Sequence, residues 1–243
     1  STQNAALRAM SAGAGEGTVV FAERQTAGRG RRGRPWHSPP GKGIYFSMLL
    51  QPDVPLSRAP QMTLLLSVAL CRAIRTETGA VAAIKWPNDI LIDGRKVCGI
   101  LVETMLEADA VKAMIAGIGI SANLCRDDFP EELKDVATSI LEETGRLVSR
   151  EALITAFFQQ FVLLYDLYRK EGFLPVKRLW EALSDTLHRR VEVADGTGQR
   201  RAVRGTAVGI TDEGALQIRD DGGRLHTVYS GDVILSPASS GGV

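Results

Sequence analysis

The stretch KWPNDILIDGRKVCGILVE, residues 85–103, carries the strongest signal for the fold. Two apolar runs within it flank Asp93-Gly94, a dipeptide typical of a type I′ turn. We therefore predict a hairpin whose strands cover 82–92 and 96–104. This hairpin decides which charged residues of the stretch are brought together.

Lys96 follows Asp89 by seven residues across the predicted hairpin. The turn can fold the ammonium group of Lys96 back toward the carboxylate. Gly99 lies on the same strand, where the lack of a side chain lets a ligand approach the backbone. An isolated Lys–Asp pair is more often a surface ion pair, but the strand context favours a pocket.

Apolar periodicity and turn residues predict the elements around the hairpin. Further strands are expected at 18–23, where the strand should be buried, and at 44–51 and 111–120. Helices are expected at 4–12, capped by Ser1 or Thr2, and at 60–78, 150–171 and 175–187. A sheet with helices on one side of it belongs to the α+β class rather than to a βαβ winding.

The character of the chain changes at residue 188. Short β-rich runs are separated by turns that contain glycine, which is typical of a small barrel. These runs cover 190–194, 201–210, 214–219, 224–229 and 232–235. We predict two domains, residues 1–187 and residues 188–243.

Composition excludes several classes of protein. The 243 residues include 29 basic and 28 acidic side chains, and a net charge of +1 argues against a general polyanion binder. An apolar fraction of 44% is enough for a folded core. No apolar run is long enough for a membrane span, and the start of the chain lacks the pattern of a secretion signal. Three widely separated cysteines predict neither a disulfide framework nor a zinc site. Such cysteine usage is typical of a reducing compartment, so we predict a cytoplasmic location.

Residues 24–43 have no hydrophobic periodicity and hold five arginines and three prolines. The run G-x-G-x-x-G at Gly28, Gly30 and Gly33 matches a dinucleotide-binding fingerprint, but Pro35 follows where a helix should begin, so we reject that interpretation. Glycines interleaved with guanidinium groups suit a loop that binds phosphate or carboxylate. A solvated loop, or a disordered RNA-binding patch, is the alternative.

The segment GIGISAN, Gly117–Asn123, ends a predicted strand with small residues that would admit a ligand. A buried glycine-rich strand explains it equally well. The three histidines show no spacing with cysteine or carboxylate that suggests a metal, so no protein-bound metal site is predicted.

The chain resembles the biotin protein ligases over essentially its whole length. The resemblance rests on Ser1-Thr2, QTAGRGRRGRPW (Gln25–Trp36), KWPNDILI (Lys85–Ile92), RKVCGILVE (Arg95–Glu103) and GIGISAN. It implies a central mixed sheet with helices, as in the class II synthetase-like fold of biotin and lipoate ligases, and a C-terminal SH3-like barrel.

The resemblance also implies the reaction. Biotin and ATP with Mg²⁺ would give biotinyl-5′-AMP and pyrophosphate, and a lysine of a biotin carboxyl carrier domain would then accept the biotinyl group. Fixed cations lower the barrier for a carboxylate that attacks a phosphate. A homodimer through the sheet edge is an expected assembly.

Residue roles follow from the same resemblance. The expected catalytic residues are Lys96, Arg31 and Asp89. The expected biotin-binding residues are Ser1, Thr2, Gln25, Gly28, Arg29, Arg31, Lys96, Gly99, Leu101 and Gly117. The expected nucleotide-binding residues are Arg29, Arg31, Arg32, Arg34, Trp36, Lys85, Asn88, Ser121 and Asn123.

Three departures from the family pattern limit this transfer. Ser121 stands where the family usually has Asn, and Cys98 stands where Ala is usual, so Ser121 should make a weaker nucleotide contact and Cys98 should be a packed residue. The N-terminal helix-turn-helix of some members is absent from the sequence, so no DNA binding is expected. A lipoate–protein ligase of the same fold and a nucleic-acid-binding module remain the alternatives.

Overall fold

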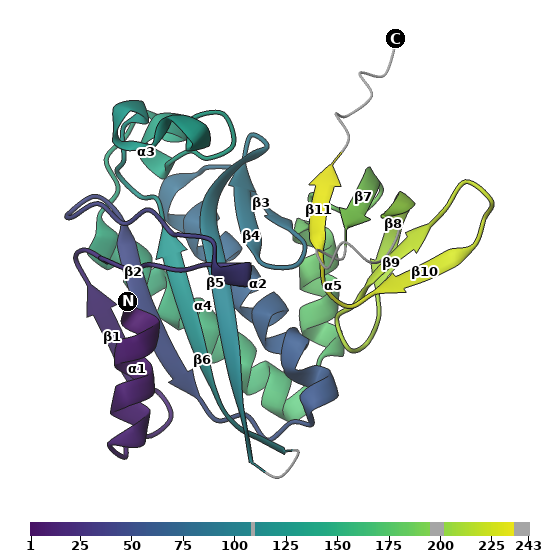
Figure 1. The fold of residues 1–243 in the computed structure, drawn as a ribbon, viewed down its shortest axis with the longest axis horizontal. Helices are drawn as coiled ribbons and strands as arrows, with labels where there is room; N and C mark the ends of the chain where they lie inside the picture. The colour runs from purple at the N-terminus through teal and green to yellow at the C-terminus, as the bar shows by residue number, and fades with distance from the viewer. Residues whose placement is uncertain (108–109, 195–201, 236–243) are drawn as a thin grey trace.

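A six-stranded sheet forms the centre of the molecule (Figure 1). The computed structural model describes residues 1–107, 110–194 and 202–235. The strands are β1 (Val19–Ala22), β2 (Ile44–Leu50), β3 (Ala82–Lys85), β4 (Asp89–Ile92), β5 (Arg95–Glu107) and β6 (Ala110–Ile120). Their order across the sheet is β1-β2-β6-β5-β4-β3, and every neighbouring pair is antiparallel. The α+β class is confirmed, but the expectation of a mixed sheet is wrong.

The hairpin at Asp93-Gly94 is confirmed, with φ angles of 48° and 73° at the two turn residues. The predicted strand 82–92 is instead two antiparallel strands, β3 and β4. Pro87 has no N–H to donate to a ladder, so the chain turns between them. Trp86 fills this turn: it is 2% exposed, and its Nε1–H donates to the carbonyl of Gly214 at 3.1 Å.

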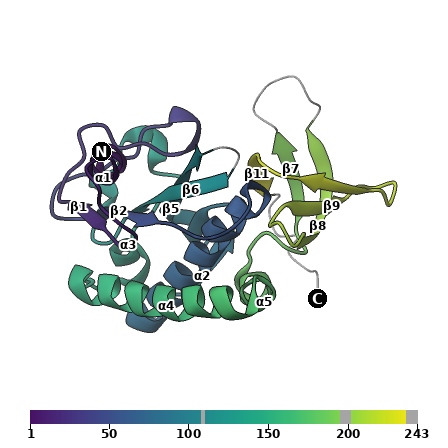
Figure 2. The same ribbon diagram turned by 90° about the horizontal axis from the view of Figure 1, so that it is seen from below.

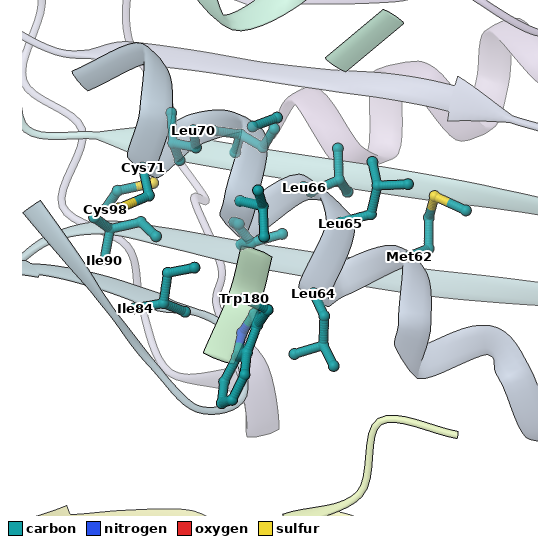
Figure 3. Close-up of a cluster of buried hydrophobic side chains, with 14 of the residues drawn as sticks. Met62, Leu64, Leu65, Leu66, Leu70, Cys71, Ile84, Ile90, Cys98 and Trp180 are labelled. Atoms are coloured by element: carbon teal, nitrogen blue, oxygen red, sulfur yellow. The ribbon is translucent and has the colours of Figure 1, made fainter. Parts of the chain in front are cut away.

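The main hydrophobic core lies between one face of the sheet and three helices, α2 (Ala59–Thr78), α4 (Arg150–Glu171) and α5 (Leu174–Leu183). Consecutive leucines of α2 pack with Ile84, Ile90, Cys98 and Trp180 in this core (Figure 3). Ser149 caps α4 as expected, whereas α5 ends four residues earlier than predicted.

Helix α1 (Thr2–Ser11) packs on the opposite face of the sheet (Figure 2). Its Ala6 contacts Leu49, Ala113 and Ile115, whose neighbours in sequence point into the main core. The expectation that all helices lie on one side is therefore wrong. Strand β1 is also less buried than predicted, because it is an edge strand and Phe21 is 51% exposed.

The polar segment between β6 and α4 forms three short helices, η3 (Arg126–Asp128), η4 (Glu131–Leu133) and α3 (Ile140–Thr144). It also fastens the strand that carries Lys96. The Lys96 N–H donates to the carbonyl of Val136 at 2.9 Å, and Thr138 N–H donates to the carbonyl of Lys96 at 2.8 Å. Both the N–H and the carbonyl of Lys96 are thus held by the segment Val136–Thr138.

A second, antiparallel sheet follows α5 in the order β10-β9-β8-β7-β11. Its strands are β7 (Arg190–Ala194), β8 (Val203–Ile210), β9 (Leu216–Arg219), β10 (Leu225–Val228) and β11 (Asp232–Leu235). They match the five predicted runs, of which residue 201 lies outside the described residues. Residues 195–200 and 236–243 of the predicted second domain also lie outside them. The domain boundary at 187/188 stays a prediction.

Two further short helices complete the described chain, η1 (Arg31–Gly33) and η2 (Leu56–Arg58). Helix η1 interrupts the segment 24–43, which otherwise forms a loop as predicted. Among the described residues, no helix is long and apolar enough to cross a membrane.

Candidate active site

A cavity of about 480 Å³ lies on the face of the sheet that carries α1. Strand register explains which side chains reach it. Lys85 pairs with Asp89, Asp89 with Gly99, and Gly99 with Gly119, so these four residues form one row across β3, β4, β5 and β6. Residues paired in this way share a face of the sheet. All four line the cavity.

Lys96 joins this row because of a β-bulge. Strand β5 has one extra residue, Val97, between the partners of Ile90 and Leu91. Val97 and Cys98 are consecutive and both fully buried in the core, so Lys96 and Gly99 can both face the cavity. A bulge re-aims side chains in this way, often beside active sites.

The Nζ of Lys96 lies 2.7 Å from Oδ1 of Asp89, and the side chains are 32% and 21% exposed. This confirms the expected pair and shows that it opens to the cavity. Lys96 also lies 5.3 Å from the ring centroid of Trp36. Burial lowers the pKa of Lys85, an effect that Asp89 partly offsets.

Three glycines form the flat floor of the cavity, and side chains of this protein lie directly on them. A Cβ at Gly119 would be 2.3 Å from Nε1 of Trp36, and one at Gly99 would be 2.9 Å from Cζ3 of the same ring. A Cβ at Gly117 would be 2.7 Å from Oε1 of Gln3. The close approach expected at Gly99 and Gly117 is therefore made by Trp36 and Gln3 in this structure.

Four uncharged polar side chains, those of Thr2, Gln3, Gln25 and Ser47, line one end of the cavity. Together with Ser38, which contacts Gln25, we call them the polar slot. Thr2 N–H donates to Oε1 of Gln25 at 2.9 Å, and Gln25 Nε2 donates to Ser38 Oγ at 3.2 Å. Ser47 Oγ lies 2.8 Å from Thr2 Oγ1 and 2.8 Å from Gln3 Oε1. Such a network fixes hydroxyl and amide groups for a neutral polar ligand.

Residues Gly28–Trp36 form a small hairpin over the cavity, which we call the arginine hairpin. Trp36 N–H donates to the carbonyl of Gly28 at 2.9 Å, and Gly30 N–H donates to the carbonyl of Arg34 at 2.7 Å. At its base Arg29 makes a two-pronged ion pair with Glu103 on β5, with a closest distance of 2.8 Å.

The tip of the hairpin contacts the second sheet. Arg31 Nη1 donates to Asn88 Oδ1 at 3.1 Å and to the carbonyl of Gly231 at 3.3 Å. Arg34 pairs with Asp232. Burial lowers the pKa of Arg31, and nearby Asp232 partly offsets this effect. Because these arginines have specific protein partners, the loop does not resemble a disordered RNA-binding patch.

Most residues expected at the site line the cavity, from Ser1 and Thr2 to Ser121. Gly28, Arg32 and Asn123 do not. Gly28 is needed where the hairpin closes, because a Cβ there would be 2.6 Å from the carbonyl oxygen of Trp36. Asn123 uses both ends of its amide on the backbone of Val148, at 2.9 and 2.8 Å, so it ties a loop together.

Asn88 and Cys98 have structural contacts. Asn88 Nδ2 donates to the carbonyl of Ile100 at 2.9 Å, which orients its oxygen toward Arg31. Cys98 is fully buried, and burial raises the pKa of its thiol, which fits a packed residue.

The cavity also holds residues that had not been predicted, among them Gln3, Ser47, Gly119 and Asp232. Strand alternation from Gly117 could have found Gly119, because residues two apart on a strand share a face. Asp232 had no local signal, since it comes from the second sheet. Within the described residues, no group of three or more His, Cys, Asp or Glu side chains is placed to hold a metal.

Comparisons with known proteins show which family the chain belongs to. A family model described as "Biotin/lipoate A/B protein ligase family" matches residues 1–121, and one described as "Biotin protein ligase C terminal domain" matches residues 186–236. The "Bifunctional ligase/repressor BirA" of Bacillus spizizenii is 44% identical over 237 residues, which cover 97% of this chain and 71% of that protein.

For two further similar proteins, the aligned region covers most of both chains. The "Biotin--[acetyl-CoA-carboxylase] ligase" of Paracoccus denitrificans is 35% identical over 84% of this chain and 85% of its own length. The structure titled "Biotin protein ligase from Aquifex aeolicus in complex with biotin and ATP" superposes with a TM-score of 0.82 at 31% identity, and covers 97% of this chain and 94% of that one. On these matches, the chain belongs to the biotin protein ligase family.

Proposed function

We propose that this protein is an ATP-dependent biotin–protein ligase. In the first step an oxygen of the biotin carboxylate attacks the α-phosphorus of ATP, and pyrophosphate leaves. In the second step a lysine amine of a biotin carboxyl carrier domain attacks the acyl carbon of biotinyl-5′-AMP. An amide bond forms, AMP leaves with the electron pair of the broken bond, and the amine loses a proton.

One observation carries this proposal: a single cavity joins fixed cations to an uncharged polar slot. Lys96 and Lys85 stand on the sheet, with Arg31 and Arg34 above them, and the polar slot lies at the α1 end. Two anions must meet in the first step, so the cations suit that end. Biotin carries a neutral ureido ring, which suits hydroxyl and amide partners.

Lys96 is the proposed centre of the first step. Its backbone N–H and carbonyl are both hydrogen-bonded to the segment Val136–Thr138, so its ammonium group needs little rearrangement to stabilise charge that develops between carboxylate and phosphate. Arg31 is the second cation, oriented by Asn88. Mg²⁺ would enter bound to the triphosphate, because this ion keeps phosphate and water ligands and needs few from protein.

Asp89 is the proposed base of the second step. In the ligand-free protein its carboxylate pairs with Lys96 at 2.7 Å. Once the reaction's own anions have engaged Lys96, Asp89 can accept the proton of the incoming lysine.

A second cavity of about 300 Å³ supports a route for this lysine. It shares Arg31, Asn88, Ile100 and Leu101 with the first cavity, and Tyr229 and Leu56 line its outer part. An acceptor side chain could enter there while biotinyl-AMP occupies the first cavity.

Residues 1–187 would form the catalytic domain and residues 188–243 the SH3-like domain. A homodimer through a sheet edge and a cytoplasmic location stay predictions.

Biotin-dependent exchange of labelled pyrophosphate into ATP tests the proposal. We expect exchange with biotin and none with lipoate or octanoate at the same concentration. Exchange with lipoate alone would make the protein a lipoate ligase. Salt-sensitive RNA or DNA binding without any exchange would favour the nucleic-acid alternative.

A further inference from the structure

Asp232 is the first residue of β11 in the second sheet, yet it lines the cavity of the first. Its carboxylate pairs with Arg34 and lies 3.2 Å from Nη1 of Arg32. The carbonyl of the preceding residue, Gly231, accepts a hydrogen bond from Arg31. Three arginines of the hairpin therefore end on two consecutive residues of the C-terminal sheet.

The tip of the arginine hairpin has no apolar anchor. Arg31 is only partly buried, Arg32 and Gly33 are exposed, and the side chain of Arg34 is 66% exposed. Arg32 has a φ of 57°, a left-handed conformation that side chains disfavour. Its turn must therefore be stabilised from outside, and the arginines of the tip contact Asn88 and Gly231-Asp232.

The charges around Asp232 also indicate that it stabilises the tip of the arginine hairpin. The guanidinium groups of Arg32 and Arg34 lie close enough to Arg31 to repel its charge, whereas Asp232 attracts both Arg31 and Lys85. Asp232 is the carboxylate that faces all four of these cations. It can hold the cations in place before an anionic substrate arrives.

We propose that Asp232 is a positioning residue of the ligase reaction: it holds the arginine hairpin closed over the cavity, so that the C-terminal sheet takes part in ATP binding and in retention of the adenylate. This inference rests on the proposed function. Asp232 acts through the arginines. A hairpin already in its closed position binds substrate without a further ordering cost.

A purely structural role for Asp232 in joining the two sheets is a weaker explanation. The sheets are already joined by Trp86 Nε1–H to the carbonyl of Gly214 at 3.1 Å and by Gln61 Nε2 to the carbonyl of Asp212 at 2.6 Å. One hydrophobic core also runs through both. Loss of the Asp232 carboxylate should therefore move the hairpin rather than unfold the protein.

The test compares Asp232→Asn with Asp232→Glu and with the control Asp221→Asn. Asp221 pairs with Arg190 at 2.6 Å in the same sheet, outside the cavity. Two quantities are measured: the KM for ATP in biotin-dependent pyrophosphate exchange, and the rate at which preformed biotinyl-AMP is released.

For Asp232→Asn we expect both quantities to rise by about fivefold, because exposed ion pairs contribute modestly. The kcat of exchange should stay within about twofold and Tm within about 2 °C. Asp232→Glu should restore both quantities, and Asp221→Asn should match wild type. Release from wild type should rise with KCl, whereas release from Asp232→Asn should not, because salt screens the pairs.

Wild-type release and KM in Asp232→Asn at low salt would overturn the inference, as would equal changes in Asp221→Asn. If Asp232→Asn does not fold, Arg34→Gln removes the same contact from the hairpin side and should raise release. Unchanged release in Arg34→Gln would then count against the proposal. Absence of exchange in wild type would instead refute the proposed function.

Discussion

The sheet beneath the cavity and the arginine hairpin above it are held by different interactions. The sheet residues Lys85, Asp89 and Lys96 stand on strands held by ladders of backbone hydrogen bonds, and the strands of Asp89 and Lys96 lie inside the sheet. The hairpin is closed by a few backbone hydrogen bonds, and its tip is held by guanidinium contacts of Arg31, Arg32 and Arg34. Rigid groups suit the reacting centre, whereas weakly held groups suit a segment that must admit substrate and then exclude water.

This comparison predicts the largest effect for Lys96→Ala on the sheet. Its ammonium group is the preorganised cation at the reacting centre, so biotin-dependent pyrophosphate exchange should fall by about a thousandfold or more. Tm should change little, because the side chain is part-exposed. The matched control is Lys112→Ala, whose ammonium pairs with Glu107, and neither residue lines the cavity. Exchange at wild-type rates in Lys96→Ala would refute the assignment.

Gly119→Ala tests the contact between sheet and hairpin. The added Cβ would lie 2.3 Å from Nε1 of Trp36, so the indole must move and the hairpin with it. We expect the KM for ATP to rise by about tenfold. Gly15→Ala is the control, because no atom lies within 4 Å of its added Cβ.

A double variant tests whether the contact with Trp36 causes the effect of Gly119→Ala. If the clash with Trp36 is the cause, Gly119→Ala should add little further loss in a Trp36→Ala background. Additive losses in the two variants would show that Gly119 acts by another route.

A smaller effect is expected at the base of the hairpin. Glu103→Gln removes the carboxylate that holds Arg29, but both side chains are partly exposed, at 34% and 40% for Arg29 and Glu103. The KM for biotin should rise by about threefold. Glu107→Gln on the same strand is the control, since its partner Lys112 lies outside the cavity. An unchanged KM for biotin would show that Arg29 keeps its position without the carboxylate of Glu103.

The smallest effect concerns stability and pH. Burial lowers the pKa of Lys85, so its charge destabilises the folded protein at neutral pH. Lys85→Met should therefore raise Tm by about 2 °C at pH 7 while it impairs activity.

The sign of the pH dependence follows from proton binding. Just below pH 10.5 the unfolded chain holds more protons on Lys85 than the folded protein does, so wild-type stability gains with rising pH there. The Tm advantage of Lys85→Met should shrink over that range. An advantage that grows with pH would contradict the burial argument. The measured quantity is the difference in Tm between wild type and Lys85→Met at each pH, because other groups titrate in the same range.

Local signals predicted much of the fold. The Asp93-Gly94 turn fixed one hairpin, and the Ser149 cap with the apolar spacing behind it gave helix α4 at its observed bounds. The split between β3 and β4 was missed because alternation on either side of Pro87 looks continuous.

The candidate site was harder to predict where it depends on pairing between distant segments. The bulge at Val97 exists because both Val97 and Cys98 pack into the core, which depends on β4 and α2. Asp232 lies 198 residues beyond Arg34 in sequence, and only the packing of the second sheet against the first brings them together.

If residues on the sheet form the adenylate and the arginine hairpin retains it, a single-turnover experiment separates the two roles most directly. Formation of biotinyl-AMP and its release are measured separately in wild type, Lys96→Ala and Arg31→Gly. We predict no adenylate in Lys96→Ala, and in Arg31→Gly formation within about tenfold of wild type with release faster by more than about tenfold. Formation as fully lost in Arg31→Gly as in Lys96→Ala, or normal formation with unchanged release, would contradict the account.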